Sequence, residues 1–113
     1  MANIGAVVIT YNEEDNIKDC LQSISWAEEI IVIDAYSEDS TVEISRKFTD
    51  KVYLREFDNF SAQKNYGLSK AGSDWILSID ADERVTDGLR REIEEIIKDS
   101  SIEKNAFFIE RLN

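Results

Sequence analysis

The sequence predicts an α/β fold of three layers, in which helices cover both faces of a mainly parallel sheet. Short apolar runs alternate along the chain with longer stretches whose apolar residues recur at helical spacing. The runs are continuous rather than alternating, so we expect the strands to be buried on both faces, as in parallel sheets. Strand and helix also follow one another in turn, which is typical of α/β domains with right-handed crossovers.

Five runs are the predicted strands. The first and second are purely apolar, the third is short, and the last three contain aromatic residues. They comprise residues 4–9, 30–33, 52–54, 75–79 and 106–109.

The first predicted helix follows the first strand. Asn12 is expected to be its N-cap, and the acidic residues directly after Asn12 favour the positive end of a helix. Its apolar stripe at positions i, i+3, i+4 and i+7 consists of Ile17, Cys20, Leu21 and Ile24.

Three more helices are predicted further along the chain. Ser40 and Glu43 are expected to form a capping box that opens a helix over residues 40–48. A third helix is predicted over residues 61–71, with Gly72 as its C-cap. The stripe of the fourth is Leu89, Ile93, Ile96 and Ile97.

Length and composition narrow the class of protein. The 113 residues fit one domain, and no apolar run approaches the roughly 20 residues of a membrane span. A net charge of −11 argues against a nucleic-acid partner. Cys20 is the single cysteine and the start of the chain lacks a basic signal region, so we expect a cytoplasmic protein. Histidine is absent, so any bound metal should prefer oxygen ligands.

Polar and acidic residues follow three of the predicted strands. The carboxyl ends of parallel strands meet at one edge of a sheet, where ligands bind near the switch point of the strand order. Helix capping explains part of this pattern, but it does not explain two aspartates directly after a buried strand. The residues concerned are Thr10, Tyr11, Asn12, Asp34, Tyr36, Ser37, Asp80, Ala81, Asp82 and Glu83.

The segment Asp80-Ala81-Asp82 predicts a metal-assisted phosphate site. Side chains alternate in an extended segment, so the two carboxylates share one side. Mg²⁺ or Mn²⁺ can bridge such carboxylates to a nucleoside diphosphate and stabilise the charge on a leaving diphosphate. An isolated Asp-x-Asp is a weak motif in an acidic chain, and its place after a buried strand strengthens it.

Four segments together resemble family 2 glycosyltransferases, which have the GT-A fold with a Rossmann-like nucleotide-binding half. They are residues 8–14, 31–34, 63–67 and 74–83, in the order and at the spacing of that family. The residues of the last two segments most resemble the bacterial subgroup that includes lipopolysaccharide-core β-glucosyltransferases. The resemblance covers roughly residues 3–98.

The resemblance implies a role for each site residue. Thr10 and Tyr11 would meet the nucleobase, with the Tyr11 ring as a stacking face, and Asp34 would accept a hydrogen bond from the nucleoside. Lys64 stands where the family usually has arginine, and Asp80 would contact the ribose. The full nucleotide-sugar set is Thr10, Tyr11, Asn12, Glu13, Asp34, Ser37, Lys64, Asp80 and Ala81, and Asp82 is the residue expected to bind Mg²⁺ or Mn²⁺.

Structural alternatives remain open for these residues. Tyr11 could pack on the core at a strand end, and Asp34 could cap the helix that begins near Ser40. Lys64 could be an ordinary solvated helix residue, and the Asp-x-Asp pair could cap a helix entry. Glu83 could support the metal site or could be an ordinary charged surface residue.

One departure from the family concerns the residues after Asp34. The family often has Ser-Gly or an acid there, whereas this chain has Ala35 and Tyr36. Tyr36 could be a second stacking residue or a plug, which leaves the identity of the nucleotide open. UDP is favoured because the family mostly uses it.

The catalytic residue is expected outside this chain. In the family, inverting sugar transfer needs a carboxylate base downstream of the Asp-x-Asp, in the acceptor-binding half. We therefore expect residues 1–113 to be the donor-binding domain of a longer enzyme, truncated before that half. The resemblance implies a glycan or lipid acceptor of the cell envelope, and a full-length protein at the inner face of the membrane. Glu92, Glu94 and Glu95 fit a solvated helix face.

Other classes of function compete with the enzyme. The same pocket could belong to a binding module without turnover. A signalling receiver domain is also acidic, α/β and of this length, but it needs a phosphorylatable aspartate after the third strand, where this chain has Arg55 and Glu56. A domain that ends early should expose Phe107 or Phe108 and self-associate.

Overall fold

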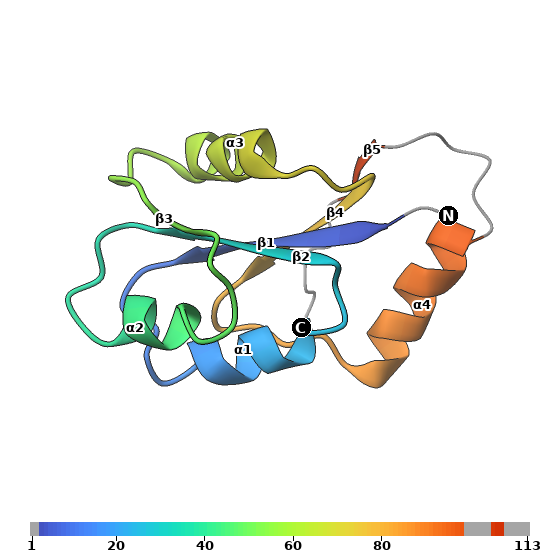
Figure 1. Ribbon diagram of the computed structural model, residues 1–113, viewed down its shortest axis with the longest axis horizontal. Helices are drawn as coiled ribbons and strands as arrows, with labels where there is room; N and C mark the ends of the chain where they lie inside the picture. Colours follow the sequence, from blue (N-terminus) through green and yellow to red (C-terminus); the bar gives the residue numbers. More distant parts are fainter. Residues whose placement is uncertain (1–2, 99–104, 108–113) are drawn as a thin grey trace.

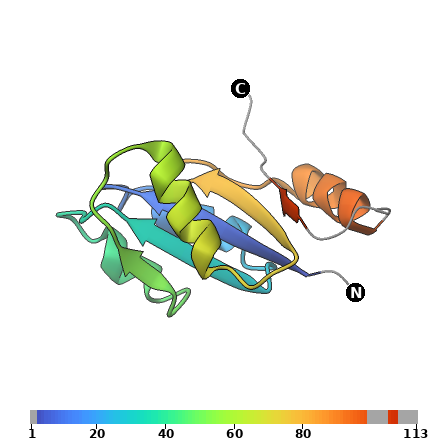
Figure 2. The same cartoon turned by 90° about the horizontal axis from the view of Figure 1, so that it is seen from above.

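The computed structural model describes residues 3–98 and 105–107, and its core is a parallel sheet of five strands. The strand order is β3-β2-β1-β4-β5, and every neighbouring pair is parallel. Figures 1 and 2 show the sheet from two directions. The strands are β1 (Ile4–Thr10), β2 (Glu29–Asp34), β3 (Val52–Leu54), β4 (Trp75–Asp80) and β5 (Asn105–Phe107).

Helices cover both faces of the sheet, so the predicted three-layer α/β fold is confirmed. Figure 1 shows α3 on one face, with α1 and α2 on the opposite face and α4 beyond them. No helix in residues 3–98 combines the length and the apolar character needed to cross a membrane. The helices are α1 (Ile17–Ser23), α2 (Thr41–Ser45), α3 (Phe60–Lys70) and α4 (Asp87–Lys98).

The central strands are apolar over most of their length because the sheet divides two hydrophobic cores. Along β1, Ala6 and Val8 belong to the larger core, which contains the predicted stripe of α1 and Ile93 of α4. Val7 and Ile9 point to the other face and belong to the core beneath α3. Every residue of β1 is therefore buried, as the continuous apolar run predicts.

Helix α3 lies directly on the sheet because of one glycine. A Cβ atom at Gly67 would lie 2.5 Å from Val7 Cγ1 and 3.3 Å from Ile33 Cγ1. Real side chains do not approach so closely, so glycine allows the helix backbone to approach β1 and β2. This contact sets how closely α3 packs against the sheet.

The predicted cap of α1 is wrong. The helix begins at Ile17 with Asn16 as its N-cap, not after Asn12. The residues between them form a turn in which the Ile17 amide donates to the Glu13 carbonyl at 2.8 Å. The Asn12 side chain accepts instead from the Glu38 amide at 2.8 Å, so a long-range contact replaces the local cap.

The capping box predicted for α2 is also absent. Ser40 does occupy the N-cap, but its side chain makes no capping hydrogen bond. Asp39 Oδ1 accepts from the Thr41 amide at 2.9 Å, and the Ser40 amide donates to Glu14 Oε1 at 3.0 Å. The helix is also shorter than residues 40–48.

The predicted ends of α3 and of the last strand need smaller corrections. The C-cap of α3 is Ala71 rather than Gly72. The Gly72 amide donates to Glu29 Oε1 at 2.8 Å, across the sheet edge. Strand β5 ends at Phe107, and predicted strand positions 108 and 109 lie outside the described residues, as does Phe108.

Candidate functional site

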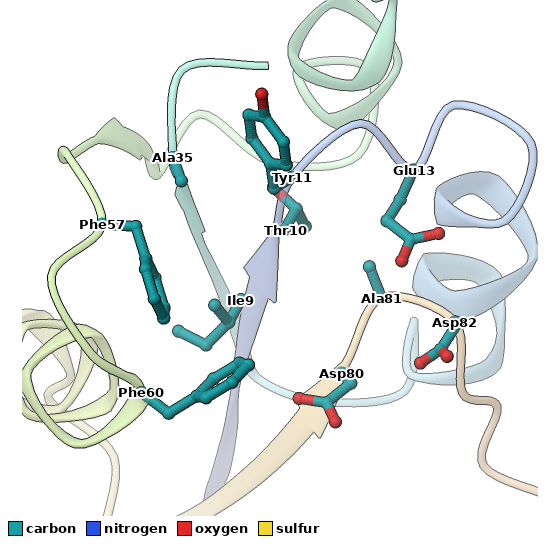
Figure 3. A pocket seen from close by; sticks show the side chains of 10 residues that line it. All are labelled: Ile9, Thr10, Tyr11, Glu13, Ala35, Phe57, Phe60, Asp80, Ala81 and Asp82. Carbon is teal, nitrogen blue, oxygen red and sulfur yellow. The ribbon is translucent and has the colours of Figure 1, made fainter.

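A cavity of about 470 Å³ lies at the carboxyl edge of the sheet. Strands β2 and β4 pair with opposite sides of β1, so the chain reverses its direction across the sheet at this position. Ligands of α/β sheets bind at such switch points, and the volume is within the usual range for small-molecule sites. Figure 3 shows the residues that line it: Ile9, Thr10, Tyr11, Glu13, Ala35, Phe57, Phe60, Asp80, Ala81 and Asp82.

Three acidic residues form one side of the cavity. Asp80 is the last residue of β4, Asp82 lies in the turn that follows, and Glu13 lies in the loop after β1. In Figure 3 the carboxylates of Glu13 and Asp82 lie on the side away from Phe57 and Phe60, and that of Asp80 lies between them and Phe60. Because Asp80 and Asp82 are exposed, this side of the cavity can attract a cation.

Glu83 closes the turn that carries these acids. Its Oε1 accepts from the Asp80 amide at 3.0 Å, and its own amide donates to the Asp80 carbonyl at the same distance. Glu83 therefore supports the backbone of the Asp-x-Asp turn. Thr86 caps α4 by accepting from the Leu89 amide at 3.1 Å, so the cap of that helix lies beyond the Asp-x-Asp pair.

Cys20 lies beneath the same turn, with its Sγ 3.7 Å from the Asp80 carbonyl oxygen. Burial, followed by the negative charge of Glu83, raises the pKa of the Cys20 thiol to about 12. A thiol with this pKa stays protonated at neutral pH, and metals and electrophiles react with the thiolate. Cys20 is therefore a packing residue rather than a reactive one.

The donor chemistry of the acidic side fits a hard divalent cation. Exposed carboxylate oxygens are ligands of the kind that Mg²⁺ and Mn²⁺ prefer. Within residues 3–98 and 105–107, no three His, Cys, Asp or Glu side chains converge closely enough to form a metal site by themselves. A cation here would need further oxygen ligands, such as substrate phosphates and water.

Asp34 joins the loops that follow β1 and β2. It is 0% exposed, and its carboxylate accepts from Thr10 Oγ1 at 2.6 Å, the Ser37 amide at 2.7 Å and Ser37 Oγ at 2.6 Å. The Asn12 amide in turn donates to Ser37 Oγ at 2.7 Å. These contacts hold Tyr11 at the rim, where its side chain is 53% exposed.

Two non-glycine residues in the described ranges have a left-handed backbone, and both lie in these loops. The φ angles are 51° at Asn12 and 61° at Tyr36. Asparagine tolerates this conformation, whereas an aromatic residue adopts it uncommonly. Tyr36 is 56% exposed and follows Ala35, which lines the cavity. The hydrogen bonds to Ser37 hold this backbone in place.

Phe57 and Phe60 form the aromatic side of the cavity, and the sequence analysis did not identify them. Their rings contact each other edge to face, with centroids 5.1 Å apart and planes at 75°. The signal that points to them is the rule already used for the other strands, since both residues follow the carboxyl end of β3. Ile9 and Ala35 also line the cavity without having been predicted.

The predicted site residues divide into two groups. Thr10, Tyr11, Glu13, Asp80, Ala81 and Asp82 line the cavity. The others do not line it: Asn12, Asp34 and Ser37 lie in the network behind Tyr11, and Lys64 lies on α3.

Two of the structural alternatives can now be decided. Tyr11 is exposed rather than packed in the core. Asp34 bonds to Thr10 and Ser37, whereas Ser40 occupies the N-cap of α2.

The fold and the site place the chain among α/β domains of the nucleotide-binding type. The sequence model described as Glycosyl transferase family 2 matches residues 6–103. An uncharacterized glycosyltransferase of Rickettsia conorii is 37% identical over 94 residues, which are 82% of this chain and 33% of the relative. The chain belongs to glycosyl transferase family 2, and the receiver-domain alternative is thereby excluded.

Two further similarities describe the relatives of this chain. The lipopolysaccharide core biosynthesis glycosyltransferase LpsC of Rhizobium meliloti is 28% identical over 83% of this chain and 37% of its own length. Glucosyl-3-phosphoglycerate synthase of Mycobacterium tuberculosis, solved with UDP, has a TM-score of 0.65 and 25% identity, over 73% of this chain and 34% of that one. That synthase has also been solved with Mn²⁺, UDP and glucosyl-3-phosphoglycerate. The chain spans about a third of the length of the curated relatives it matches.

Proposed function

We propose that residues 1–113 are the donor-binding part of a glycosyltransferase. The donor is a nucleotide-diphospho-sugar, with UDP as the favoured nucleotide, and it is bound together with Mg²⁺ or Mn²⁺. The whole enzyme transfers the sugar with inversion to a glycan or lipid acceptor of the cell envelope. Its catalytic base and acceptor site belong to sequence beyond Asn113, and the enzyme works at the cytoplasmic face of the membrane.

The observation that carries this proposal is the two-sided character of the cavity at the switch point. One side presents Asp80, Asp82 and Glu13, and the other presents aromatic rings. A nucleotide-diphospho-sugar has a flat apolar base at one end and a diphosphate that binds divalent cations. The name of LpsC supports an envelope acceptor, and the UDP and Mn²⁺ complexes of the mycobacterial synthase support the nucleotide and the metal.

Each lining residue has a part in this proposal. Asp82 is the residue that would hold the cation, which stabilises the charge on the leaving diphosphate when it is bound. Asp80 faces the ribose, Ala81 leaves room beside it, and Glu13 borders the acidic side. The Tyr11 ring offers a stacking face to the base beside Thr10.

The residues behind the rim hold those that contact the donor. Asp34, Asn12 and Ser37 keep the Tyr11 loop in place, and because Asp34 is fully buried and does not line the cavity, its part in donor binding is to hold that loop. Lys64, half-buried on α3, supplies positive charge on the side of β3 and α3. These assignments make the fold of both loops a condition for donor binding.

Calorimetric titration of UDP with and without Mn²⁺ tests the proposal. We expect binding that depends on Mn²⁺, and we expect Asp82→Asn to weaken it by about tenfold or more, since loss of even an outer partner of a metal ligand has an effect of that size. Asp87→Asn is the matched control, because Asp87 is exposed at the start of α4 and does not line the cavity.

Two results would count against this proposal. If the folded wild-type chain binds no UDP with either cation, residues 1–113 are not a donor-binding part. If UDP binds equally with and without metal, and Asp82→Asn has no effect, the assigned role of Asp82 is wrong. Sugar transfer by the longer protein distinguishes an enzyme from a binding module that lacks turnover.

A further inference from the structure

Phe57 and Phe60 stand out because they are large apolar side chains left open to solvent at the cavity. Their exposed fractions are 45% and 60%. Phenylalanine usually gains stability from burial, so exposing two adjacent rings sacrifices folding free energy. Exposed aromatic residues that line a cavity commonly mark a binding surface.

The segment that carries these rings is held rigidly. Arg55 Nη1 donates to Asp58 Oδ1 at 3.0 Å and to Gln63 Oε1 at 2.6 Å. Gln63 is fully buried, and its Nε2 donates back to the Arg55 carbonyl at 3.1 Å. Asn59 caps α3 by accepting from the Ala62 amide at 2.8 Å. These hydrogen bonds fix the backbone that carries the rings, so their exposure does not result from a loosely packed loop.

The position of the rings indicates which part of a ligand they meet. Both line the cavity with Ile9, on the side opposite the carboxylates of Glu13 and Asp82, and the Asp80 carboxylate lies between the two sides (Figure 3). A single ligand that occupies both sides must place an apolar, flat group at the rings and an anionic, cation-binding group at the acids. In a nucleotide-diphospho-sugar these groups are the nucleobase and the diphosphate.

We infer that Phe57 and Phe60 form an aromatic wall against which the nucleobase of the donor stacks. The inference rests on the proposed donor-binding function and adds two residues to it. Stacking uses the π-face that every base has, so the aromatic wall contributes affinity without identifying the base. Recognition of the base then depends on polar groups elsewhere at the rim, such as Thr10.

The test compares two probes in the presence of Mg²⁺: UDP, which has a base, and inorganic pyrophosphate, which has none. Loss of one stacking ring typically weakens binding by about 5- to 100-fold. We expect Phe57→Ala and Phe60→Ala to weaken UDP binding by such a factor, and to leave pyrophosphate binding within about twofold of the wild type. Asp82→Asn should weaken both probes.

Two control variants separate stacking from loss of structure. Leu54→Ala removes another exposed apolar side chain of the same region that does not line the cavity, so UDP binding should not change. Phe57→Tyr keeps an aromatic face and should retain most of the UDP affinity. Circular dichroism and thermal unfolding of each variant show whether it is folded.

Four outcomes would overturn the aromatic wall. If UDP binding needs Asp82 but is insensitive to both alanine variants, the donor site is supported and the aromatic wall is contradicted. If UDP and pyrophosphate weaken equally, the rings maintain the shape of the cavity and do not meet a base. If the alanine variants weaken UDP-glucose but not UDP, the rings contact the sugar. Failure of the wild type to bind UDP would overturn the proposed function and the wall together.

Discussion

At each edge of the sheet, one carboxylate joins separate segments of the chain, but only one of the two edges borders a cavity. At the amino edge, Glu29 Oε1 accepts from the Gly72 amide at 2.8 Å and from the Ser73 amide and hydroxyl at 3.1 and 3.0 Å. Its Oε2 lies 2.6 Å from Lys51 Nζ. At the carboxyl edge, Asp34 likewise gathers donors from two loops. Each carboxylate ties together segments that are distant in sequence.

The difference lies in what surrounds each carboxylate. At the carboxyl edge, the loops joined by Asp34 border a cavity with exposed acids and aromatic rings. At the amino edge, Glu29 closes the turn between α3 and β4. A carboxylate whose oxygens are bonded within the protein is thus a structural device, and the acids exposed at a cavity are the candidates for binding. Variants at each edge should separate stability from UDP binding.

The largest effect is expected from Asp34→Ala. This change removes a fully buried acceptor and leaves the Thr10 hydroxyl and the Ser37 amide without their partner, which should cost about 2–4 kcal/mol. UDP binding should also weaken, because the Tyr11 loop loses its support. Denaturant unfolding and UDP titration measure the two effects. Asp34→Asn keeps one acceptor oxygen and should lose less stability; equal losses would argue against hydrogen bonding as the cause.

Glu29→Ala should reduce stability by a smaller amount, about 1–2 kcal/mol, because water can reach part of this edge and replace lost partners. UDP affinity should stay within about twofold of the wild type, since the amino edge lies about 20 Å from the cavity along strands of six to seven residues. Unfolding and titration on the same preparation test this separation. A large loss of UDP affinity in the folded variant would contradict the claim that the amino edge serves stability alone.

The acid stability of the chain should depend on Glu29. Burial alone raises the pKa of Glu29, but the hydrogen bonds from Lys51, Gly72 and Ser73 outweigh it, so the pKa lies below its ordinary value of 4.5. A lowered pKa means that the unfolded state binds the proton at higher pH. The stabilisation is therefore complete above pH 4.5 and is lost as the pH falls through the folded-state pKa.

The measurement is the difference in unfolding free energy between the wild type and Glu29→Gln across this pH range. It should be constant near neutral pH and should shrink as acid is added. A difference that grows with acid would show that the direction of the pKa shift is wrong.

The last prediction needs no substitution and concerns the reactivity of Cys20. Because the pKa of its buried thiol is about 12, a native chain at pH 8 should react with a thiol reagent at least about 100-fold more slowly than the unfolded chain. Absorbance of a released thiolate dye follows the reaction. Rapid labelling of the native chain would mean that the Asp80 turn above Cys20 opens readily.

The sheet was predictable because its signals are local. Apolar runs identify strands that are buried on both faces, and the carboxyl-edge rule then brings Thr10 and Asp80 together. The cap of α1 was not predictable, because the Asn12 side chain binds the Glu38 amide, 26 residues away. The burial of Asp34 depends on similar long-range contacts.

The aromatic side was predictable only in part. Phe48 packs against the larger core, whereas Phe57 and Phe60 are exposed. The carboxyl-edge rule places Phe57 and Phe60 near the cavity because both follow β3, but no local pattern distinguishes their exposed rings from the packed ring of Phe48. The residue type is visible in the sequence, but the side on which it lies is set by packing.

Paramagnetic broadening by Mn²⁺ in the presence of UDP tests the central claim most directly. In a ¹⁵N-labelled chain, we expect the amide signals of residues 10–13, 35–37 and 80–83 to broaden strongly. Signals of residues 28–30 and 71–74, at the amino edge, should keep their intensity. Strong broadening at the amino edge, or uniform broadening over the whole sheet, would contradict a donor site at the carboxyl edge.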